Sequence, residues 1–217
     1  MHSVREDESM APTILVIDDD PSVRKSLSRL LRSFGFTVEN FESAEHFLKR
    51  ELYKGTGCII LDIRMPGISG MALQDELNKR DCDLPIIFIT GHGDIPTGVQ
   101  AMKKGAVDFL PKPFDDDQLL DAVRKAIEKS RHIQTARSET NDIRGRLALL
   151  TPREREVVPY IIAGFLNKQI AFKLSVAEKT IKVHRARIME KLGAGSLAGL
   201  VRLAEKAGIE PAKKTEQ

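Results

Sequence analysis

Short apolar runs alternate with amphipathic stretches through roughly the first 130 residues of the chain. Apolar runs that are continuous, and not alternating, are typical of strands buried on both faces of a parallel sheet. The chain has four such runs and one weaker run, and we predict a strand for each. The five runs are "ILVI" (14–17), "TVENF" (37–41), "CIIL" (58–61), "PIIFI" (85–89) and "VDFL" (107–110).

The stretches between these runs have the period of amphipathic helices. The first has an apolar face made of Val23, Leu27, Leu30, Leu31 and Phe34. Gly35 is predicted to end that helix. Further helices are predicted over 43–52, 70–80, 95–104 and 115–130. The helix over 95–104 should be the weakest because it contains Gly98. Five strands alternating with five helices predict an α/β fold, an open parallel sheet covered on both faces.

The last third of the chain predicts helices only. Thr151, Pro152 and Glu154 form a capping-box pattern that starts a helix, which runs to about Ala163 and contains Pro159 as an expected kink. Three more helices are predicted: 168–174 with Asn167 as its cap, 178–192, and one that Ser196 caps and Gly208 ends. A turn of three residues joins the second helix to the third, which indicates a helix-turn-helix unit.

Residues 131–150 are polar and contain no proline. Their small and apolar residues follow a 4-3-4-3 spacing, at Ala136, Thr140, Ile143, Leu147 and Leu150. Such a spacing fits a short coiled-coil seam or an amphipathic linker helix. Because Ala and Thr are weak seam residues, we interpret 131–145 as a helical linker. It would join a domain over 12–130 to a second domain over 146–211.

A chain of 217 residues is long enough for these two domains. The net charge of +3 conceals an asymmetry between them. Residues 146–217 hold 14 Lys/Arg and 7 Asp/Glu, whereas residues 1–145 hold 20 Lys/Arg and 24 Asp/Glu. The basic second half makes nucleic acid a candidate partner of the second domain.

The composition predicts a cytoplasmic protein without a membrane partner. No apolar run approaches the ~20 residues that span a bilayer. The N-terminus is acidic and lacks the apolar core of a signal peptide. Cys58 and Cys82 match no metal spacing, and we interpret both as reduced thiols that serve in packing.

Polar residues stand at the carboxyl ends of four predicted strands, the edge where ligands bind in open α/β sheets. Asp18 and Asp19 follow the first strand, Asp62 the third, Thr90 the fourth and Lys112 the fifth. An ordinary turn, cap or surface charge would explain each of them alone. Together they indicate a site where Mg²⁺ (or Mn²⁺) relieves the repulsion between carboxylates and the lysine balances the remaining charge.

This set of side chains suits phosphoryl transfer onto a carboxylate. Asp62 would attack a phosphodonor as the nucleophile. The metal ion would neutralise charge on the transferring oxygens. Thr90 and Lys112 would then bind the new phosphoryl group.

Several motifs resemble a known family. Over about 12–130, "VIDDD", "LDIRMPGISG", "FITGHGDI" and "DFLPKPF" resemble the receiver domain of two-component response regulators. Over about 146–208, "LTPREREV", "NKQIAFKLSVAEKTIKVHRARIMEKLG" and "SLAGLVRLAEKAG" resemble the LuxR/FixJ-type helix-turn-helix. The arrangement resembles the FixJ subfamily. It implies a flavodoxin-like, doubly wound receiver followed by a four-helix domain, and a transcription regulator, not an enzyme.

The resemblance also implies partners and site residues. A sensor histidine kinase would phosphorylate Asp62. Asp19, Asp62 and the backbone carbonyl of Arg64 would bind Mg²⁺ directly, and Asp18 would contribute through water. Duplex DNA and RNA polymerase would be the further partners.

A second group of implied residues concerns switching. Thr90 and Phe109 would form the switch pair, and the Lys112–Pro113 peptide bond would be cis. By the same resemblance, phosphorylation would pair two receivers into a homodimer through the face made by helix 95–104, the fifth strand and helix 115–130.

Helix 178–192 separates into two faces when its residues are placed 100° apart. One face packs on the other helices and consists of Ile181, His184, Ile188 and Leu192. The opposite face consists of Lys179, Lys182, Val183, Ala186, Arg187 and Glu190. Basic residues around small apolar ones suit the DNA major groove, and Arg185, near the border, fits a phosphate contact. The family often begins this helix with Ser-Pro, where this chain has Ala177 and Glu178, so a cap worth about 1 kcal/mol is missing.

Two alternatives remain open from the sequence. Asp18, Asp20 and Ser22 fit a D-x-D-x-S pattern similar to haloacid-dehalogenase-type phosphatases, which also use an aspartyl nucleophile. That class normally needs a longer core or a cap insertion, and it leaves the basic domain unexplained. The basic helix could instead bind RNA or protein, but it shows no aromatic platform for stacking single-stranded bases.

Overall fold

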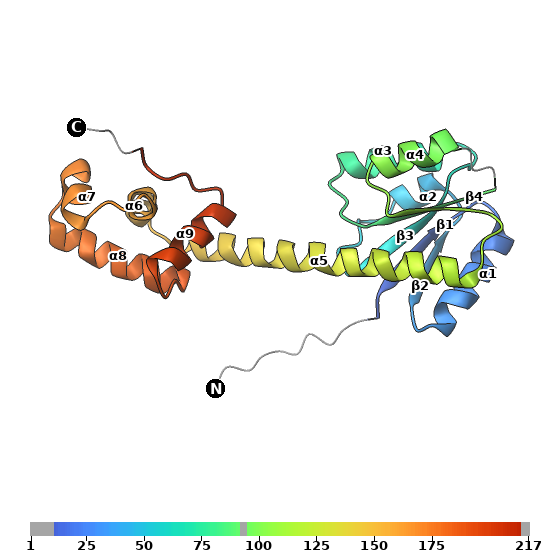
Figure 1. Cartoon of the computed structure of the whole chain (residues 1–217), viewed down its shortest axis with the longest axis horizontal. Helices are drawn as coiled ribbons and strands as arrows, with labels where there is room; N and C mark the ends of the chain where they lie inside the picture. The colour runs from blue at the N-terminus through green and yellow to red at the C-terminus, as the bar shows by residue number, and fades with distance from the viewer. Residues whose placement is uncertain (1–10, 92–94, 214–217) are drawn as a thin grey trace. The chain divides into compact units, whose positions relative to one another are not determined.

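The computed structural model of the chain describes residues 11–91 and 95–213 (Figure 1). The chain divides into two compact units between Gln134 and Thr135. The first unit alternates strands with helices, and the second consists of helices. Within the described ranges, no helix is both long enough and apolar enough to cross a bilayer.

A parallel sheet of five strands forms the centre of the first unit, in the order β2-β1-β3-β4-β5. Its strands are β1 (Thr13–Ile17), β2 (Thr37–Phe41), β3 (Gly57–Asp62), β4 (Ile86–Thr90) and β5 (Asp108–Pro111). Each overlaps its predicted run. This order is the flavodoxin-like, doubly wound order, whose ligands bind where β1 and β3 diverge. The predicted fold class is therefore confirmed.

Four helices connect the strands, namely α1 (Pro21–Ser33), α2 (Ala44–Leu48), α3 (Gly70–Lys79) and α4 (Ile95–Lys103). The Asp20 carboxylate caps α1 by accepting the Ser22 N–H at 2.7 Å. The predicted helix over 43–52 is too long. Helix α2 ends at Leu48, because Leu52 and Tyr53 leave the helical path and pack against the core.

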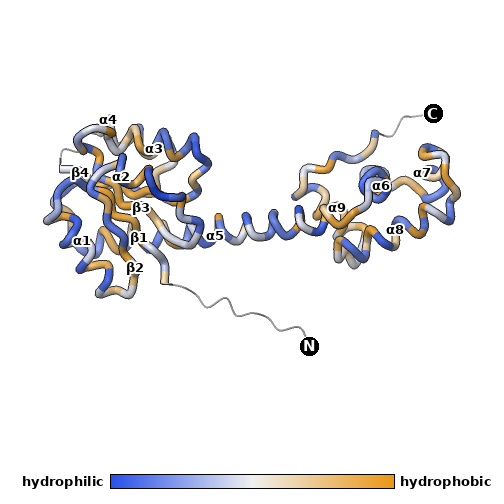
Figure 2. The backbone as a smooth tube through the Cα atoms, turned by 180° about the vertical axis from the view of Figure 1, so that it is seen from behind, coloured by the Kyte–Doolittle hydropathy of each residue, from blue (hydrophilic) through white to orange (hydrophobic). Residues whose placement is uncertain are grey.

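Each face of the sheet has its own apolar core, because alternate residues of a buried strand point to opposite sides. Figure 1 shows α3 and α4 on one side of the sheet and α5 on the other. The core on the α1 and α5 side contains Ile14, Val16, Cys58 and Ile60. The core on the other side contains Leu15, Ile17, Ile59 and Leu61. In Figure 2 the strands are the most consistently hydrophobic part of this unit.

Helix α5 runs without interruption from Asp116 to Ala148. The sequence separated a helix over 115–130 from a linker helix over 131–145, whereas the structure has one helix. The stretch between them is polar but has no proline, and Gly145 lies near the end of the helix. Ala136 is exposed and Ile143 is buried in the core of the second unit, so the 4-3-4-3 residues differ in their surroundings.

Four further helices build the second unit, namely α6 (Pro152–Ile162), α7 (Asn167–Leu174), α8 (Glu178–Leu192) and α9 (Leu197–Lys206). The predicted capping box is confirmed. The Thr151 N–H donates to Glu154 Oε2 at 2.8 Å, and the Glu154 N–H donates to Thr151 Oγ1 at 3.3 Å. Helix α6 continues through Pro159. The predicted Ser196 cap is also confirmed, since its hydroxyl accepts the Gly199 N–H.

The predicted cap of α7 is wrong. Leu166 occupies the cap position, and its N–H donates to Gln169 Oε1 at 2.8 Å. Asn167 is the first helical residue, and its side-chain oxygen accepts a hydrogen bond from Arg185 instead. The side chain that was expected to cap the start of α7 therefore joins α7 to α8.

Candidate functional site

The predicted polar residues gather at the carboxyl edge of the sheet. Asp18 follows β1, Asp62 ends β3, Thr90 ends β4, and Lys112 follows β5. Asp18 and Thr90 are each 1% exposed and Asp62 is 5% exposed, so the strands hold these side chains out of bulk water. Parallel register brings residues that are far apart in sequence to one edge.

A single ammonium group bridges the two buried carboxylates. Lys112 Nζ lies 2.8 Å from Asp18 Oδ2 and 2.9 Å from Asp62 Oδ1. The other oxygen of each carboxylate accepts a backbone N–H, from Asp20 at 2.8 Å and from Arg64 at 2.7 Å. The peptide bond that follows Lys112 is cis, as the resemblance implied.

The environment of these groups changes their proton affinity. Burial raises the pKa of Asp62, and the nearby Lys112 ammonium opposes that shift. Burial pulls the pKa of Lys112 down, but its hydrogen bonds to Asp18 and Asp62 outweigh this and leave it raised. Lys112 therefore stays positively charged at neutral pH, and Asp62 is a carboxylate that solvent stabilises poorly.

The structure brings only some of the predicted metal ligands together. Asp19 is exposed beside the bridged pair. Across residues 11–91 and 95–213, no three side chains of Asp, Glu, His or Cys lie close enough together to hold a metal ion. The donor chemistry still fits a hard cation. The groups are oxygens, and a bound cation would oppose the raised pKa of Asp62. The metal ligands stay a prediction.

The predicted switch residues lie on neighbouring strands. The Thr90 carbonyl accepts the Lys112 N–H at 2.7 Å. Phe109, on β5, is partly buried and packs beside Gly98 of α4, where an added Cβ would lie 3.4 Å from the ring. A side chain at position 98 would therefore contact the aromatic ring directly. The motif "FITGHGDI" is only partly described, because residues 92–94 lie outside the described ranges.

Helix α8 presents the predicted basic face to solvent. Its exposed residues include all six of that face, Lys179, Lys182, Val183, Ala186, Arg187 and Glu190. Ile181, Ile188 and Leu192 are buried on the opposite side, while His184 is only partly buried. Arg185 is half-buried, and its Nη1 lies 3.3 Å from Asn167 Oδ1. No side chain caps α8 at Ala177, as the sequence predicted.

Comparison with known protein families identifies the combination of this polar sheet edge with the basic helix α8. Residues 14–124 match the response regulator receiver domain, and residues 148–204 match the bacterial regulatory proteins of the luxR family. The chain belongs to the response regulators.

Relatives of this response regulator match along most of its length. Nodulation protein W of Bradyrhizobium diazoefficiens is 46% identical over 94% of this chain and 89% of its own. The transcriptional regulatory protein FixJ of Azorhizobium caulinodans is 45% identical over 91% of this chain and 93% of its own. The response regulator StyR, whose structure was solved at low resolution, matches with a TM-score of 0.82 at 48% identity. That match covers 91% of this chain and all (100%) of StyR.

These matches give a FixJ-like response regulator with a receiver domain and a LuxR-type DNA-binding domain, and hence phosphorylation-dependent regulation of transcription. They do not support the haloacid-dehalogenase alternative. In receiver domains in general, the phosphorylation site binds Mg²⁺.

A buried ion pair in the DNA-binding domain of this response regulator was not predictable from the sequence. Glu154 is 1% exposed, and Lys191 Nζ lies 2.7 Å from its Oε2. The hydrogen bond from Lys191 lowers the pKa of Glu154, although burial opposes it. The capping-box motif revealed the local role of Glu154. No periodicity pointed to a lysine 37 positions away on α8.

Proposed function

We propose that a sensor histidine kinase phosphorylates Asp62, and that this modification pairs two chains whose α8 helices then read duplex DNA. One observation carries the proposal. The Lys112 ammonium contacts Asp62 and Asp18 at the carboxyl edge of the sheet, with both carboxylates buried. A buried nucleophilic carboxylate beside a fixed positive charge suits the acceptance of a phosphoryl group.

The transfer is a displacement at phosphorus. A carboxylate oxygen of Asp62 forms a bond to phosphorus while the P–N bond of the kinase phosphohistidine breaks. The electron pair of that bond stays on the imidazole nitrogen, which takes up a proton, and an aspartyl phosphate results. Lys112 remains protonated because its pKa is raised, so it can pair with the oxygens of the new phosphoryl group.

The residues for a metal ion are Asp18, Asp19, Asp62 and the backbone carbonyl of Arg64. When bound, Mg²⁺ supplies positive charge that offsets the charge of the transferring oxygens. The buried carboxylates with Lys112 between them support this assignment, because one ammonium offsets only one of their two charges.

The switch follows from the new phosphoryl group. Thr90 would move toward it, and Phe109 would fill the space that Thr90 leaves. Because the Phe109 ring packs on Gly98, this movement would reach α4 directly. Val99 and Met102 on α4 are 47% and 45% exposed, so the face of α4, β5 and α5 offers apolar surface for pairing two receivers.

Pairing of two chains provides the second DNA-reading helix that recognition of a promoter requires. A single helix in the major groove contacts only a few base pairs, so two copies on half-sites about one helical turn apart are needed to select a promoter. Lys179, Lys182, Val183, Ala186 and Arg187 would make the base and backbone contacts, and Arg185 would meet a phosphate. RNA polymerase is the proposed next partner at that promoter.

Selection of duplexes from a random pool tests this function. The full-length protein is used with and without beryllofluoride, which mimics the phosphoryl group. We expect two-fold symmetric sites to be enriched with beryllofluoride, together with a shift from monomer to dimer in sedimentation velocity. Asp62→Asn should remove both responses. Equal enrichment and an unchanged mass distribution in the two conditions would contradict the proposal.

A further inference from the structure

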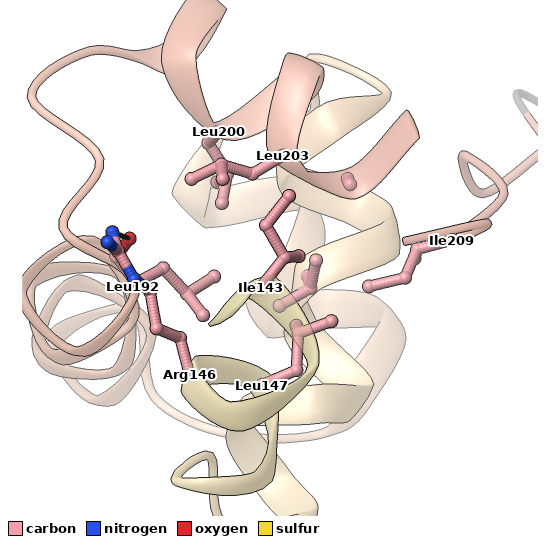
Figure 3. A pocket seen from close by; sticks show the side chains of 9 residues that line it. Ile143, Arg146, Leu147, Leu192, Leu200, Leu203 and Ile209 are labelled. Carbon is pink, nitrogen blue, oxygen red and sulfur yellow. Dashed lines mark hydrogen bonds between the residues drawn. The ribbon is translucent and has the colours of Figure 1, made fainter. Parts of the chain in front are cut away.

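The last turns of α5 are part of the DNA-binding unit, although the luxR-family match begins only at residue 148. Ile143 is 6% exposed and Leu150 is 4% exposed, and Leu147 packs against the same core. Figure 3 shows Ile143, Arg146 and Leu147 facing residues of α8 and α9. A second contact between α5 and α9 lies one helical turn earlier, where Lys206 Nζ lies 2.6 Å from Glu139 Oε2.

Arg146 reaches the carboxyl end of α8. Its Nη1 donates to the carbonyl of Leu192, the last residue of α8, at 3.1 Å. The last carbonyls of a helix lack partners within the helix and carry partial negative charge, so a guanidinium there is favourable. The next residue, Gly193, has a left-handed backbone, and a Cβ there would lie 2.9 Å from Arg146 Nη1. Glycine at 193 therefore allows the left-handed turn that ends α8, and it leaves room for the Arg146 side chain.

Other contacts hold the Arg146 side chain in this position. Asp142, one turn earlier on α5, lies 2.8 Å from Nη2. The side chain lines a cavity of about 10 Å³ together with Leu192, Leu200 and Leu203 (Figure 3). A space of that size holds at most one water molecule, so it is a packing feature and not a ligand site.

The two ends of α8 are fixed differently. The amino end begins at Ala177 without a side-chain cap. The carboxyl end is fixed three times: by the Lys191–Glu154 ion pair, by the left-handed Gly193, and by Arg146. The carboxyl end of α8 therefore has several anchoring contacts, and one of them comes from α5.

We propose that Arg146 is a positioning residue for DNA recognition. It fixes the carboxyl end of α8 against α5, so that the exposed basic face of α8 meets the base edges in register. This inference rests on the proposed function, in which α8 reads DNA. It also gives α5 a defined point of contact with the DNA-reading helix.

The test uses full-length Arg146→Met, which keeps most of the packing and removes the donor. Arg144→Met is the matched control, because Arg144 is exposed on the same helix and its loss removes the same charge. The two probes are a duplex selected from a random pool by the unsubstituted protein, and poly(dI-dC). We expect Arg146→Met to bind the selected duplex about tenfold more weakly, the size of one lost base contact. Its affinity for poly(dI-dC) should stay within about twofold of that of Arg144→Met, because binding to phosphates does not depend on the reading of base edges.

Amide hydrogen exchange distinguishes a positioning role of Arg146 from general destabilisation of the DNA-binding unit. Arg146→Met should speed exchange at the amides of Gly193 and Ala194 while leaving that of Ile181, in the middle of the domain core, unchanged. An unchanged ratio of the two affinities in Arg146→Met, or a parallel loss of both with faster exchange at Ile181, would overturn the inference. If the unsubstituted protein enriches no duplex at all, the proposed function itself fails.

Discussion

Lys112 Nζ lies 2.9 Å from Oδ1 of Asp62, and this contact joins the end of β5 to the end of β3. The same ammonium lies 2.8 Å from Asp18, so one positive charge serves two buried carboxylates. The site therefore has an excess of negative charge at rest. In the proposed function, a bound cation would offset this excess, and Lys112 would pair with the oxygens of the phosphoryl group.

Lys112→Met should slow the phosphorylation of Asp62 by acetyl phosphate about tenfold or more, because it removes a fixed charge from the reacting oxygens. Separation of the two forms on a phosphate-affinity gel gives the rate. Lys125→Met is the control, since Lys125 is exposed on α5. An unchanged rate in Lys112→Met would show that the lysine is only a structural partner of the carboxylates.

Gly98→Ala should raise the free energy of unfolding of the receiver by about 0.5–1 kcal/mol, because alanine favours the helix more than glycine does. Its Cβ would also lie 3.4 Å from the Phe109 ring. We therefore expect the stiffened α4 to weaken dimerisation with beryllofluoride, measured by sedimentation velocity. Gly145→Ala is the matched control, because a Cβ there meets nothing within 4 Å. Equal dimerisation in the two variants would show that Gly98 takes no part in the switch.

The sheet and its polar edge were predictable because the signals are local. Buried parallel strands require continuous apolar runs, and parallel register then places Asp18, Asp62, Thr90 and Lys112 at one edge. The bridging position of Lys112 between two carboxylates was not predictable. Its partners lie 94 and 50 residues away in the chain, and only the folded sheet fixes which of them it meets.

The linker and the cap of α7 were harder to predict, because tertiary contacts decide them. The polar stretch after residue 130 gave no reason to join two helices, yet α5 is continuous and its end is held by the buried Ile143. Asn167 has the chemistry of a cap, but Arg185 on a neighbouring helix binds its side chain. Propensity alone does not distinguish these outcomes.

Glu154→Gln should remove a pH dependence of stability in the DNA-binding unit. The folded pKa of Glu154 is lowered from 4.5, so its charged form stabilises the fold above that value. This contribution is lost as the pH falls through the lowered folded pKa. At neutral pH the variant should lose about 1–3 kcal/mol, and below pH 4.5 the difference should shrink. Urea unfolding followed by circular dichroism measures both.

The control for this variant is Glu156→Gln, which removes an ion pair with Arg153 at the surface. Exposed pairs contribute about 0–1 kcal/mol, so this change should be small at every pH. A loss in Glu154→Gln that is the same at pH 7 and pH 3 would contradict the assigned role of the buried pair.

A fragment of residues 135–217 should be a folded DNA-binding unit, whereas one of residues 151–217 should be weakened. The shorter fragment lacks Ile143, Leu147 and Leu150, which pack into the core of this unit. Each buried side chain of this kind contributes about 1.5–3 kcal/mol, so we expect a loss of at least ~3 kcal/mol in urea unfolding. Equal stability of the two fragments would place the end of α5 outside the domain.

Trapping of the acyl phosphate shows which residue accepts the phosphoryl group. The full-length protein is incubated with acetyl phosphate and Mg²⁺, reduced with labelled borohydride, and digested, and the labelled residue is located by mass spectrometry. We expect label on Asp62 alone, at no more than one per chain, and none in Asp62→Asn. Label on Asp18 or Asp19, or undiminished label in Asp62→Asn, would contradict it.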